Sequence, residues 1–516
     1  RLGEAKVGDA GIAITGKYSS TADHTASATT TATGQTQGNS VAIGASIGLT
    51  VATDTVTASL ERDMDATTGV ELSARSVARS STSATASVAG GEKADADDKP
   101  PAKPDGTAGN TVDQKVAGQQ TKATDAGKAA ATKAPAAGAA ATAGAGAGAT
   151  AKLNDTKAPP TTEEKDDNGQ DKGGGVSVAA AVGVNAGIAT TTASVAKGKK
   201  ISSRNGALKV KSAAQLDAKA KADGSQVNGG NTDVGVGAAV ALNLGVGTNV
   251  AVIGDNADVD SKGVEVQAVM AVTPAKGVIP EDKTSDFGAD AKSGAGANNV
   301  GVAGALAVNT VVNTTVATIE GDKDSSGAGA NVNATTAGGA GDVLVEAQSA
   351  TKSTVASGAD VKMEGDKATV GVGASVGLNV AVNTTVAEIA DAAVLSGGND
   401  LDLNAKADHV MGTTVTGGAA GAKVAITPVA AVSIAVNTTT ARAGTSSTAL
   451  SPGGELSVHA DQTDKVTTKA TGQAQGDVAV GASLAASVVV ETVSASVERD
   501  VASYTAVYVD SSSESS

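Results

Sequence analysis

The amino-acid sequence predicts an all-β protein built as a repetitive β-solenoid, a parallel β-helix with wide coils. Three observations lead to this prediction. One unit recurs seven times, apolar and small or polar residues alternate strictly within it, and aromatic residues make up only 1% of the chain. A stack of long antiparallel hairpins has the same sequence pattern, and the sequence leaves this alternative open.

The repeated unit is clearest in VGVGAAVALNLGVGTNVAVI from residue 234, VGVAGALAVNTVVNTTVATI from residue 300 and VGVGASVGLNVAVNTTVAEI from residue 370. All seven copies align on an alanine near their end. Neighbouring anchors lie 54 to 70 residues apart, except that 135 residues separate the first two. Units of this kind cannot bury an apolar face alone and must stack on their neighbours. The anchors are Ala58, Ala193, Ala251, Ala317, Ala387, Ala441 and Ala495.

The period within each unit is two, which is typical of a β-strand. From Val370 onward, every second position holds Val, Ala or Leu as far as Val382, while the positions between them hold Gly, Ser, Asn or Ala. A helix would instead place its apolar residues three and four positions apart. We expect the aliphatic face to point into a narrow core filled by ladders of Val, Leu and Ala.

A shorter alternating element follows each unit after a turn, as in GVELSA from residue 69, GVEVQA from residue 263 and GGELSVHA from residue 453. Stretches rich in Thr, Ala and Ser then lead to the next unit. Each repeat is therefore expected to hold about three extended segments joined by turns of Gly, Asp, Asn and Ser.

The composition excludes several kinds of protein. With 65 Gly, no Cys, no Trp, 3 Tyr and 1 Phe, the chain has no disulfides, zinc–thiolate sites or cysteine nucleophiles, and few large side chains for an ordinary core. Its net charge of −15 argues against nucleic-acid binding. No apolar run approaches the roughly 18 residues of a membrane-spanning helix, and no signal peptide is visible, so we expect a piece of a longer protein.

The repeats divide the chain into three parts. Residues 1–90 and 176–516 carry solenoid repeats, the latter with six units and an acidic, Ser-rich end. Residues 91–175 form a low-complexity insertion of Ala, Gly, Pro and Lys that holds six of the ten prolines. Such a composition buries too little apolar area to offset the entropy of ordering, so we expect this insertion to be disordered.

Two sets of polar residues are candidates for a special role. The triplet Asn-Thr-Thr recurs, and in a solenoid its residues are expected to form side-chain ladders, through Asn313, Thr314, Asn383, Thr384, Asn437 and Thr438. Closely spaced carboxylates in the turns after the units suit Ca²⁺, although solvated turns explain them more simply. These candidates are Asp255, Asp258, Asp260, Glu320, Asp322 and Asp324. No other cofactor is expected.

No catalytic constellation stands out. The three histidines, His24, His409 and His459, lie in polar stretches, and no pairing of a histidine with an acidic residue recurs at a fixed spacing. A hydrolytic site needs a nucleophile, a base and an orienting group that converge in space. The sequence therefore predicts a protein that is not an enzyme.

The alternation in VGVGASVGLNVAVNTTVAEI, followed by a turn and a segment such as GGELSVHA, resembles repeats of very large secreted bacterial surface proteins. These are filamentous-haemagglutinin-like and autotransporter-type adhesins. The resemblance covers the chain apart from the insertion. It implies a β-helical stalk outside the cell, on the bacterial surface, that spaces or presents adhesive elements in cell-surface or biofilm attachment.

The partners expected on this basis are a host or neighbouring cell surface, a glycan or a matrix, and no nucleic acid. The acidic surface opposes lateral aggregation of stalks, while lateral self-association is left open. Two alternatives from other classes remain: a module that binds ice or glycan through its Thr/Asn face, and a β-helical enzyme acting on polysaccharide, which would need a groove with clustered carboxylates.

Overall fold

The computed structural model describes residues 11–38, 41–90, 175–225, 232–271, 283–322, 329–336, 339–363, 368–502 and 504–516. Within these ranges the regular structure consists of β-strands, which stack in sequence order as a parallel solenoid. The predicted fold class is therefore confirmed. All long strands pair in parallel, and among the described residues only the two-residue strands β15 (Thr335–Thr336) and β16 (Gly339–Ala340) pair in antiparallel fashion.

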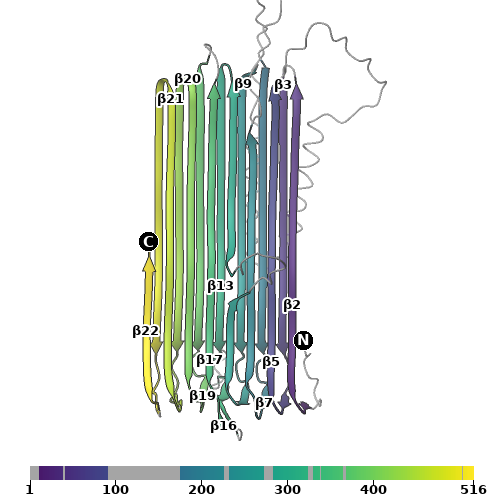
Figure 1. The fold of residues 1–516 in the computed structure, drawn as a ribbon, viewed down its shortest axis with the longest axis vertical. Helices are drawn as coiled ribbons and strands as arrows, with labels where there is room; N and C mark the ends of the chain where they lie inside the picture. The colour runs from purple at the N-terminus through teal and green to yellow at the C-terminus, as the bar shows by residue number, and fades with distance from the viewer. Residues whose placement is uncertain are drawn as a thin grey trace, which may run out of the picture.

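The repeated units form one long layer, which we call sheet I. Its strands follow each other side by side in chain order, and the last two are the second halves of longer strands (Figure 1). They are β3 (Val41–Leu60), β6 (Gly175–Val195), β9 (Thr232–Ile253), β13 (Val300–Ile319), β18 (Val370–Ile389), and the later parts of β20 (Leu401–Ala443) and β21 (Glu455–Val497).

The segments between units form a second layer, sheet II, which runs in the opposite direction and packs face to face with sheet I. Its strands are β2 (Lys17–Gly38), β5 (Gly69–Gly90), β8 (Leu208–Ser225), β11 (Val264–Met270) followed by β12 (Ser285–Ala297), β17 (Val343–Met363), the earlier parts of β20 and β21, and β22 (Ala506–Ser515). In β20 the chain passes from one sheet to the other at Gly421, whose φ of 87° favours glycine.

Short strands close the coils at one end. They are β1 (Ile12–Ile14), β4 (Met64–Ala66), β7 (Lys200–Ser203), β10 (Asp258–Ser261), β14 (Asn331–Asn333) and β19 (Val394–Ser396), and they form a six-stranded parallel sheet, sheet III. The described coils together make a slab whose longest dimension runs along the strands (Figure 1).

About three extended segments per coil were predicted, but the prediction of which residues form them was partly wrong. The short element and the Thr/Ala/Ser-rich stretch after it belong to one continuous strand, as in β5. The third segment is instead the short strand of sheet III, which lies in the turn after each of the first five units. Because these strands hold only three or four residues, the period-two pattern is too short to reveal them.

The two ends of each coil have different cores. Near sheet III, where three layers meet, branched aliphatic side chains fill the interior. One ladder of this core runs through Val70, Leu208, Val264, Val343, Leu401 and Leu456, each at most 2% exposed. The ladder core expected from the sequence is present at this end, and all three sheets contribute to it.

At the other end, sheets I and II approach so closely at several positions that mostly small side chains fit. A Cβ atom on Gly373 would lie 2.2 Å from the carbonyl oxygen of Gly418 in the facing sheet, and one on Gly183 would lie 2.3 Å from that of Lys221. Alanines dominate the apolar part of this core. The single phenylalanine, Phe287, is fully buried opposite Gly245, where a Cβ would touch its ring at 2.3 Å.

The expectation that the aliphatic face of the units forms the core is therefore wrong. In β18 the buried residues are Gly371, Gly373, Ser375, Gly377 and Asn379, while the Val and Leu residues between them face outward. Since side chains alternate strictly between the two faces of a strand, filling a thin interior with small residues leaves the large ones on the outer surface.

The predicted insertion falls between β5 of sheet II and β6 of sheet I. Residues 91–174, and with them the prediction of disorder, lie outside the described residues. The solenoid pattern continues directly after them, because β6 pairs with β3 in the register Val41↔Val176.

Candidate functional site

The outer surface of sheet I is a regular aliphatic array, which we call the aliphatic face. Its first column consists of seven valines in register: Val41, Val176, Val234, Val300, Val370, Val424 and Val478. The six columns that follow hold mostly Ile, Val, Leu and Ala. Many of these side chains are well exposed, including Val41 at 55%, Val376 at 43% and Leu484 at 59%.

A threonine ladder borders the aliphatic face on the side of sheet III. It contains one residue from each strand: Thr55, Thr190, Thr248, Thr314, Thr384, Thr438 and Thr492. Between the valine column and this ladder, the outward positions of all seven strands hold no charged residue. The aliphatic face is thus uncharged across its whole width.

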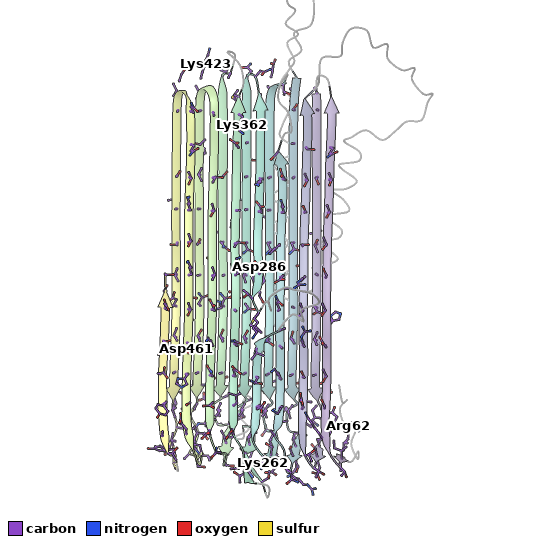
Figure 2. The ribbon with its side chains drawn as sticks, in the orientation of Figure 1. Arg62, Lys262, Asp286, Lys362, Lys423 and Asp461 are labelled. Carbon is purple, nitrogen blue, oxygen red and sulfur yellow. The ribbon has the colours of Figure 1, made fainter. Side chains whose placement is uncertain are left out.

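The outer surface of sheet II has the opposite character. Lys209, Lys219 and Lys352 are among its outward side chains, and ion pairs join neighbouring coils. Arg79 Nε lies 3.1 Å from Asp217 Oδ2, and Lys219 Nζ lies 2.6 Å from Asp286 Oδ2. Charged side chains such as Asp286 and Lys362 are spread along the length of the strands (Figure 2). The two broad surfaces of the slab therefore differ sharply in polarity.

A ladder of buried asparagines runs through the interior. Asn185 Nδ2 donates to Asn243 Oδ1 at 2.8 Å, Asn243 Nδ2 to Asn309 Oδ1 at 2.7 Å, and Asn309 Nδ2 to Asn379 Oδ1 at 3.1 Å. The hydroxyl of Ser353 in sheet II accepts from Asn309 at 2.7 Å and donates to Asn379 at 2.6 Å. These bonds link four successive coils to one another and to the facing sheet.

This ladder was not predicted, although a signal for it is present in the sequence. Each of its four asparagines stands at the same offset before the anchor alanine of its unit, as Asn243 does before Ala251 and Asn379 does before Ala387. Since a fixed offset in a solenoid means vertical stacking, this position alone predicts an amide ladder.

The predicted Asn-Thr-Thr residues stack in register, but on opposite sides of the sheet. Asn313, Asn383 and Asn437 face the interior, where Asn383 Nδ2 donates to Asn437 Oδ1 at 2.8 Å and Asn313 Nδ2 donates to Ser349 Oγ at 2.9 Å. Thr314, Thr384 and Thr438 face outward as part of the threonine ladder. Asn and the first Thr of the triplet therefore do not share one outward face, because alternation separates the two residue types. Binding of ice or a glycan stays a prediction.

The described calcium candidates in the turns contact residues of neighbouring coils. Asp255 is buried, with Lys197 Nζ 3.0 Å from its Oδ2, and its backbone N–H donates to Glu320 Oε2 at 3.1 Å. Asp258 pairs with Lys200 at 3.0 Å, and Asp260 accepts from Asn333 Nδ2 at 3.1 Å.

No group of three or more His, Asp or Glu side chains suited to a metal ion occurs among the residues that the structure describes. Asp322 lies at the end of a described segment, and Asp324 falls outside the described residues. The calcium site therefore stays a prediction. Asp255, Asp258 and Asp260 contact Lys197, Lys200 and Asn333, respectively, in neighbouring coils.

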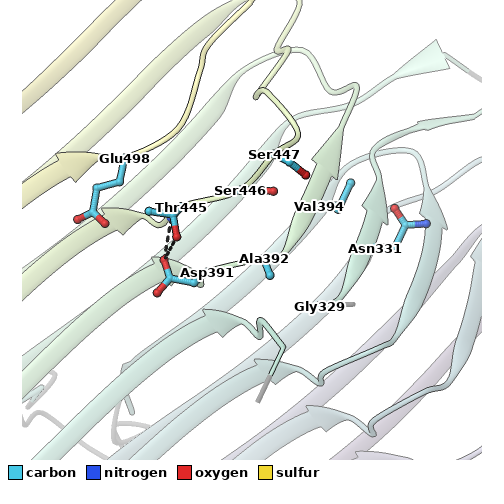
Figure 3. A pocket seen from close by; sticks show the side chains of 9 residues that line it. All are labelled: Gly329, Asn331, Asp391, Ala392, Val394, Thr445, Ser446, Ser447 and Glu498. Carbon is cyan, nitrogen blue, oxygen red and sulfur yellow. Dashed lines mark hydrogen bonds between the residues drawn. The ribbon is translucent and has the colours of Figure 1, made fainter. Parts of the chain in front are cut away.

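A groove of about 570 Å³ opens at the turns beside sheet III, lined in part by Asp391, Thr445 and Glu498 (Figure 3). The backbone N–H and hydroxyl of Thr445 donate to Asp391 Oδ1 at 2.7 and 2.9 Å. These hydrogen bonds, together with Arg442, hold the pKa of Asp391 below its usual value. Arg442 also lies 3.2 Å from Glu498 Oε2.

The hydrogen bonds and ion pairs of this groove connect successive coils, which suits a structural role. A glycoside-cleaving acid needs a raised pKa, whereas that of Asp391 is lowered. Beside the groove, Arg499 is 8% exposed and donates to the carbonyl oxygens of Ala390, at 2.9 Å, and Ala393, at 2.6 Å, as well as to that of Gly444. The turns of successive coils are thus tied together by arginine.

The described histidines have separate partners and do not form a shared site. His24 Nδ1 lies 2.5 Å from Asp54 Oδ1, and the hydroxyl of Ser76 donates to the other oxygen of Asp54. His409 is buried and bonded to the Thr351 hydroxyl at 2.8 Å, and His459 pairs with Asp510 near the last strand. In the Ser76–Asp54–His24 chain the carboxylate lies in the middle, so the histidine has no contact with the hydroxyl that it would have to activate.

A carboxylate with an altered pKa lies near the C-terminal coil. Burial, together with the charge of Glu491, raises the pKa of Asp464 to about 6. Gln462 Nε2 donates to Asp464 Oδ2 at 2.7 Å, and Asp464 stands next to His409 in the register of β20 and β21. The proximity of Asp464 and Glu491 was not predicted from the sequence, because the two residues lie in different halves of β21.

Comparison with known proteins gives no relative: no family model, no curated protein and no solved structure matches this chain. The described part of the structure holds no helix with the length and apolar character required to cross a bilayer.

Proposed function

We propose that this chain is a structural segment of a secreted bacterial surface protein, a stalk that spaces or presents adhesive elements on the outside of the cell. The observation that carries this proposal is the unbroken register of seven coils. From β3 to the end of β21, every unit pairs with the next in the same register, and the anchor alanines form one column. A stack of this kind extends by adding coils.

Three features support a structural role over a catalytic one. The buried asparagine ladder, the cross-coil ion pairs and the arginine-tied turns all connect successive coils. The described titratable residues are mostly engaged in these contacts, and those lining the groove include an aspartate whose pKa is lowered. The resemblance of the repeats to adhesin stalks supplies the extracellular location and the adhesive context.

Surface labelling tests the proposal directly. An antiserum raised against the purified chain is applied to intact cells of the organism that produces it, with and without permeabilisation. We expect intact cells to be labelled, whereas labelling that requires permeabilisation would contradict the surface location.

A panel of polysaccharides is incubated with the same protein, and release of reducing ends would overturn the purely structural role.

The threonine ladder favours a second candidate function, the binding of ice or a glycan. Seven identical hydroxyls stand at the strand spacing of about 4.8 Å on a flat outer surface. If this ladder binds ice, the protein shows thermal hysteresis, and Thr384→Tyr abolishes it without lowering the melting temperature of the fold. Absence of hysteresis and of binding to a glycan array removes this candidate.

A further inference from the structure

We propose that the aliphatic face is an interface for a second copy of this chain, so that two solenoids pair back to back through sheet I. This inference concerns how the proposed stalk is assembled and rests on the structural role proposed above. It starts from the size of the face. From the valine column to the column before the threonine ladder, each strand contributes 13 residues, as from Val370 to Val382, on seven adjacent strands.

This array covers roughly 1,400 Å², taking about 3.3 Å per residue and about 4.8 Å per strand. The largest apolar patch on a typical monomer is about 300–600 Å². Two such faces in contact would bury more surface than the roughly 1,200–2,000 Å² of a standard stable interface. The face is therefore large enough to hold a dimer together without any other contact.

The shape of the face fits another copy of itself. The strands run straight and side by side (Figure 1), and the outward columns repeat the same residue types at each strand step. Side chains from two identical surfaces with equal strand spacing can interdigitate at the usual distance of about 10 Å between packed sheets. A two-fold axis would then bring each column against its counterpart, as an isologous interface requires.

The distribution of charge favours the same partner. The aliphatic face carries no charge between the valine column and the threonine ladder. Ion-paired side chains lie on sheet II, in the turns and, beyond the threonine ladder, at Glu388 and Arg442 of sheet I. In a back-to-back pair, the acidic surfaces of both copies remain in water and far from each other. The net charge of −15 therefore does not oppose this pairing in the way that it opposes contact through sheet II.

A lipid surface fits this face less well. Side chains at a bilayer interface typically include Trp and Tyr, yet the chain has no Trp, and its three tyrosines, Tyr18, Tyr504 and Tyr508, lie outside the aliphatic face. A strongly acidic protein is also repelled by anionic membranes. The occupant that the observations favour is a second copy.

Light scattering coupled to size-exclusion chromatography, with a dilution series by sedimentation velocity, tests the pairing. We expect the wild-type chain to have twice its mass of 49.1 kDa at micromolar concentration. The double variant Val376→Lys with Val382→Lys places charge on two exposed outward positions and is expected to be monomeric. Its matched control, Thr354→Lys with Ala356→Lys on the outer surface of sheet II, is expected to remain dimeric.

Far-UV circular dichroism and the melting temperature show whether each variant is folded. If the lysine variant does not fold, Val376→Thr with Val382→Thr replaces it and is expected to weaken the dimer at least tenfold. A monomeric wild-type chain overturns the proposal, as does a dimer that the outward substitutions leave intact. Flotation of a monomeric chain with phosphatidylcholine vesicles would assign the face to lipid instead. None of these outcomes affects the surface-labelling test, so the two proposals fail independently.

Discussion

At the scale of single residues, the interior of this protein is held by polar side chains that satisfy one another across coils. Asn243 and Asn309 each donate to the next asparagine of the ladder, and Ser353 joins it from the facing sheet. A buried amide without partners would cost about 1–3 kcal/mol, so the ladder is stabilising only while it is continuous. The contributions of two other buried side chains, His409 and Asp464, to the free energy of unfolding depend on pH, because burial shifts their pKa values.

The burial of His409 makes stability depend on pH in a defined direction. Burial lowers its pKa from 6.5 to about 4. The unfolded chain binds the proton near pH 6.5 and the folded chain only near pH 4, so His409 lowers the free energy of unfolding as the pH falls through this interval. The loss approaches about 3 kcal/mol, at about 1.4 kcal/mol per pH unit.

The comparison of two variants isolates this effect. His409→Gln keeps an acceptor for the Thr351 hydroxyl and is expected to gain stability relative to wild type between pH 6.5 and 4, measured by urea unfolding at several pH values. His459→Gln, at an exposed position, is the control. Asp464 acts in the opposite direction, because its raised pKa favours the folded state at lower pH, and it is present in all three proteins. A constant difference between His409→Gln and wild type across this range would contradict the assignment.

At the scale of the strand, the spacing between sheets decides which face of a unit is buried. The alternation from Val370 to Val386 predicts a strand, and the anchor alanines predict its register. The pattern alone does not say which set points inward, since both faces alternate equally well. The deciding contacts are made by residues far away in the sequence, such as Gly418 opposite Gly373 and Lys221 opposite Gly183. For the same reason, the acidic turns alone do not reveal which lysines and asparagines of neighbouring coils contact their carboxylates.

A pair of glycine substitutions tests the close approach of the sheets. Gly373→Ala places a Cβ 2.2 Å from the backbone oxygen of Gly418, which no side-chain rotation can relieve. We expect it to lower the free energy of unfolding by about 1–3 kcal/mol. Gly304→Ala, on the outward face of β13, meets nothing within 4 Å and is expected to be neutral or to stabilise by about 0.4–1 kcal/mol. Equal effects of the two changes in urea unfolding would argue against a thin interior at Gly373.

At the scale of the whole molecule, the near-absence of aromatic residues follows from the geometry of the coils. A slab that is thin over much of its width has room for rings at few places, and the one phenylalanine faces a glycine. Because the interior is thin, many large aliphatic side chains lie on the outer surface of sheet I, while charged side chains lie on the outer surface of sheet II. The protein is therefore two-sided, and this two-sidedness underlies both the structural role and the pairing proposed above.

The measurement that tests the fold most directly is disulfide formation between neighbouring coils, which is clean because the native chain has no cysteine. Thr314 and Thr384 are register partners that both face outward, at a Cα separation of about 4.8 Å, which a disulfide can span. The paired variant Thr314→Cys with Thr384→Cys is predicted to lose its free thiols on mild oxidation, as an intrachain crosslink. The pair Thr314→Cys with Thr385→Cys, in which the second residue faces the interior, is predicted to keep them. Crosslinking of the second pair instead of the first, or of neither, would contradict an in-register solenoid with this face outward.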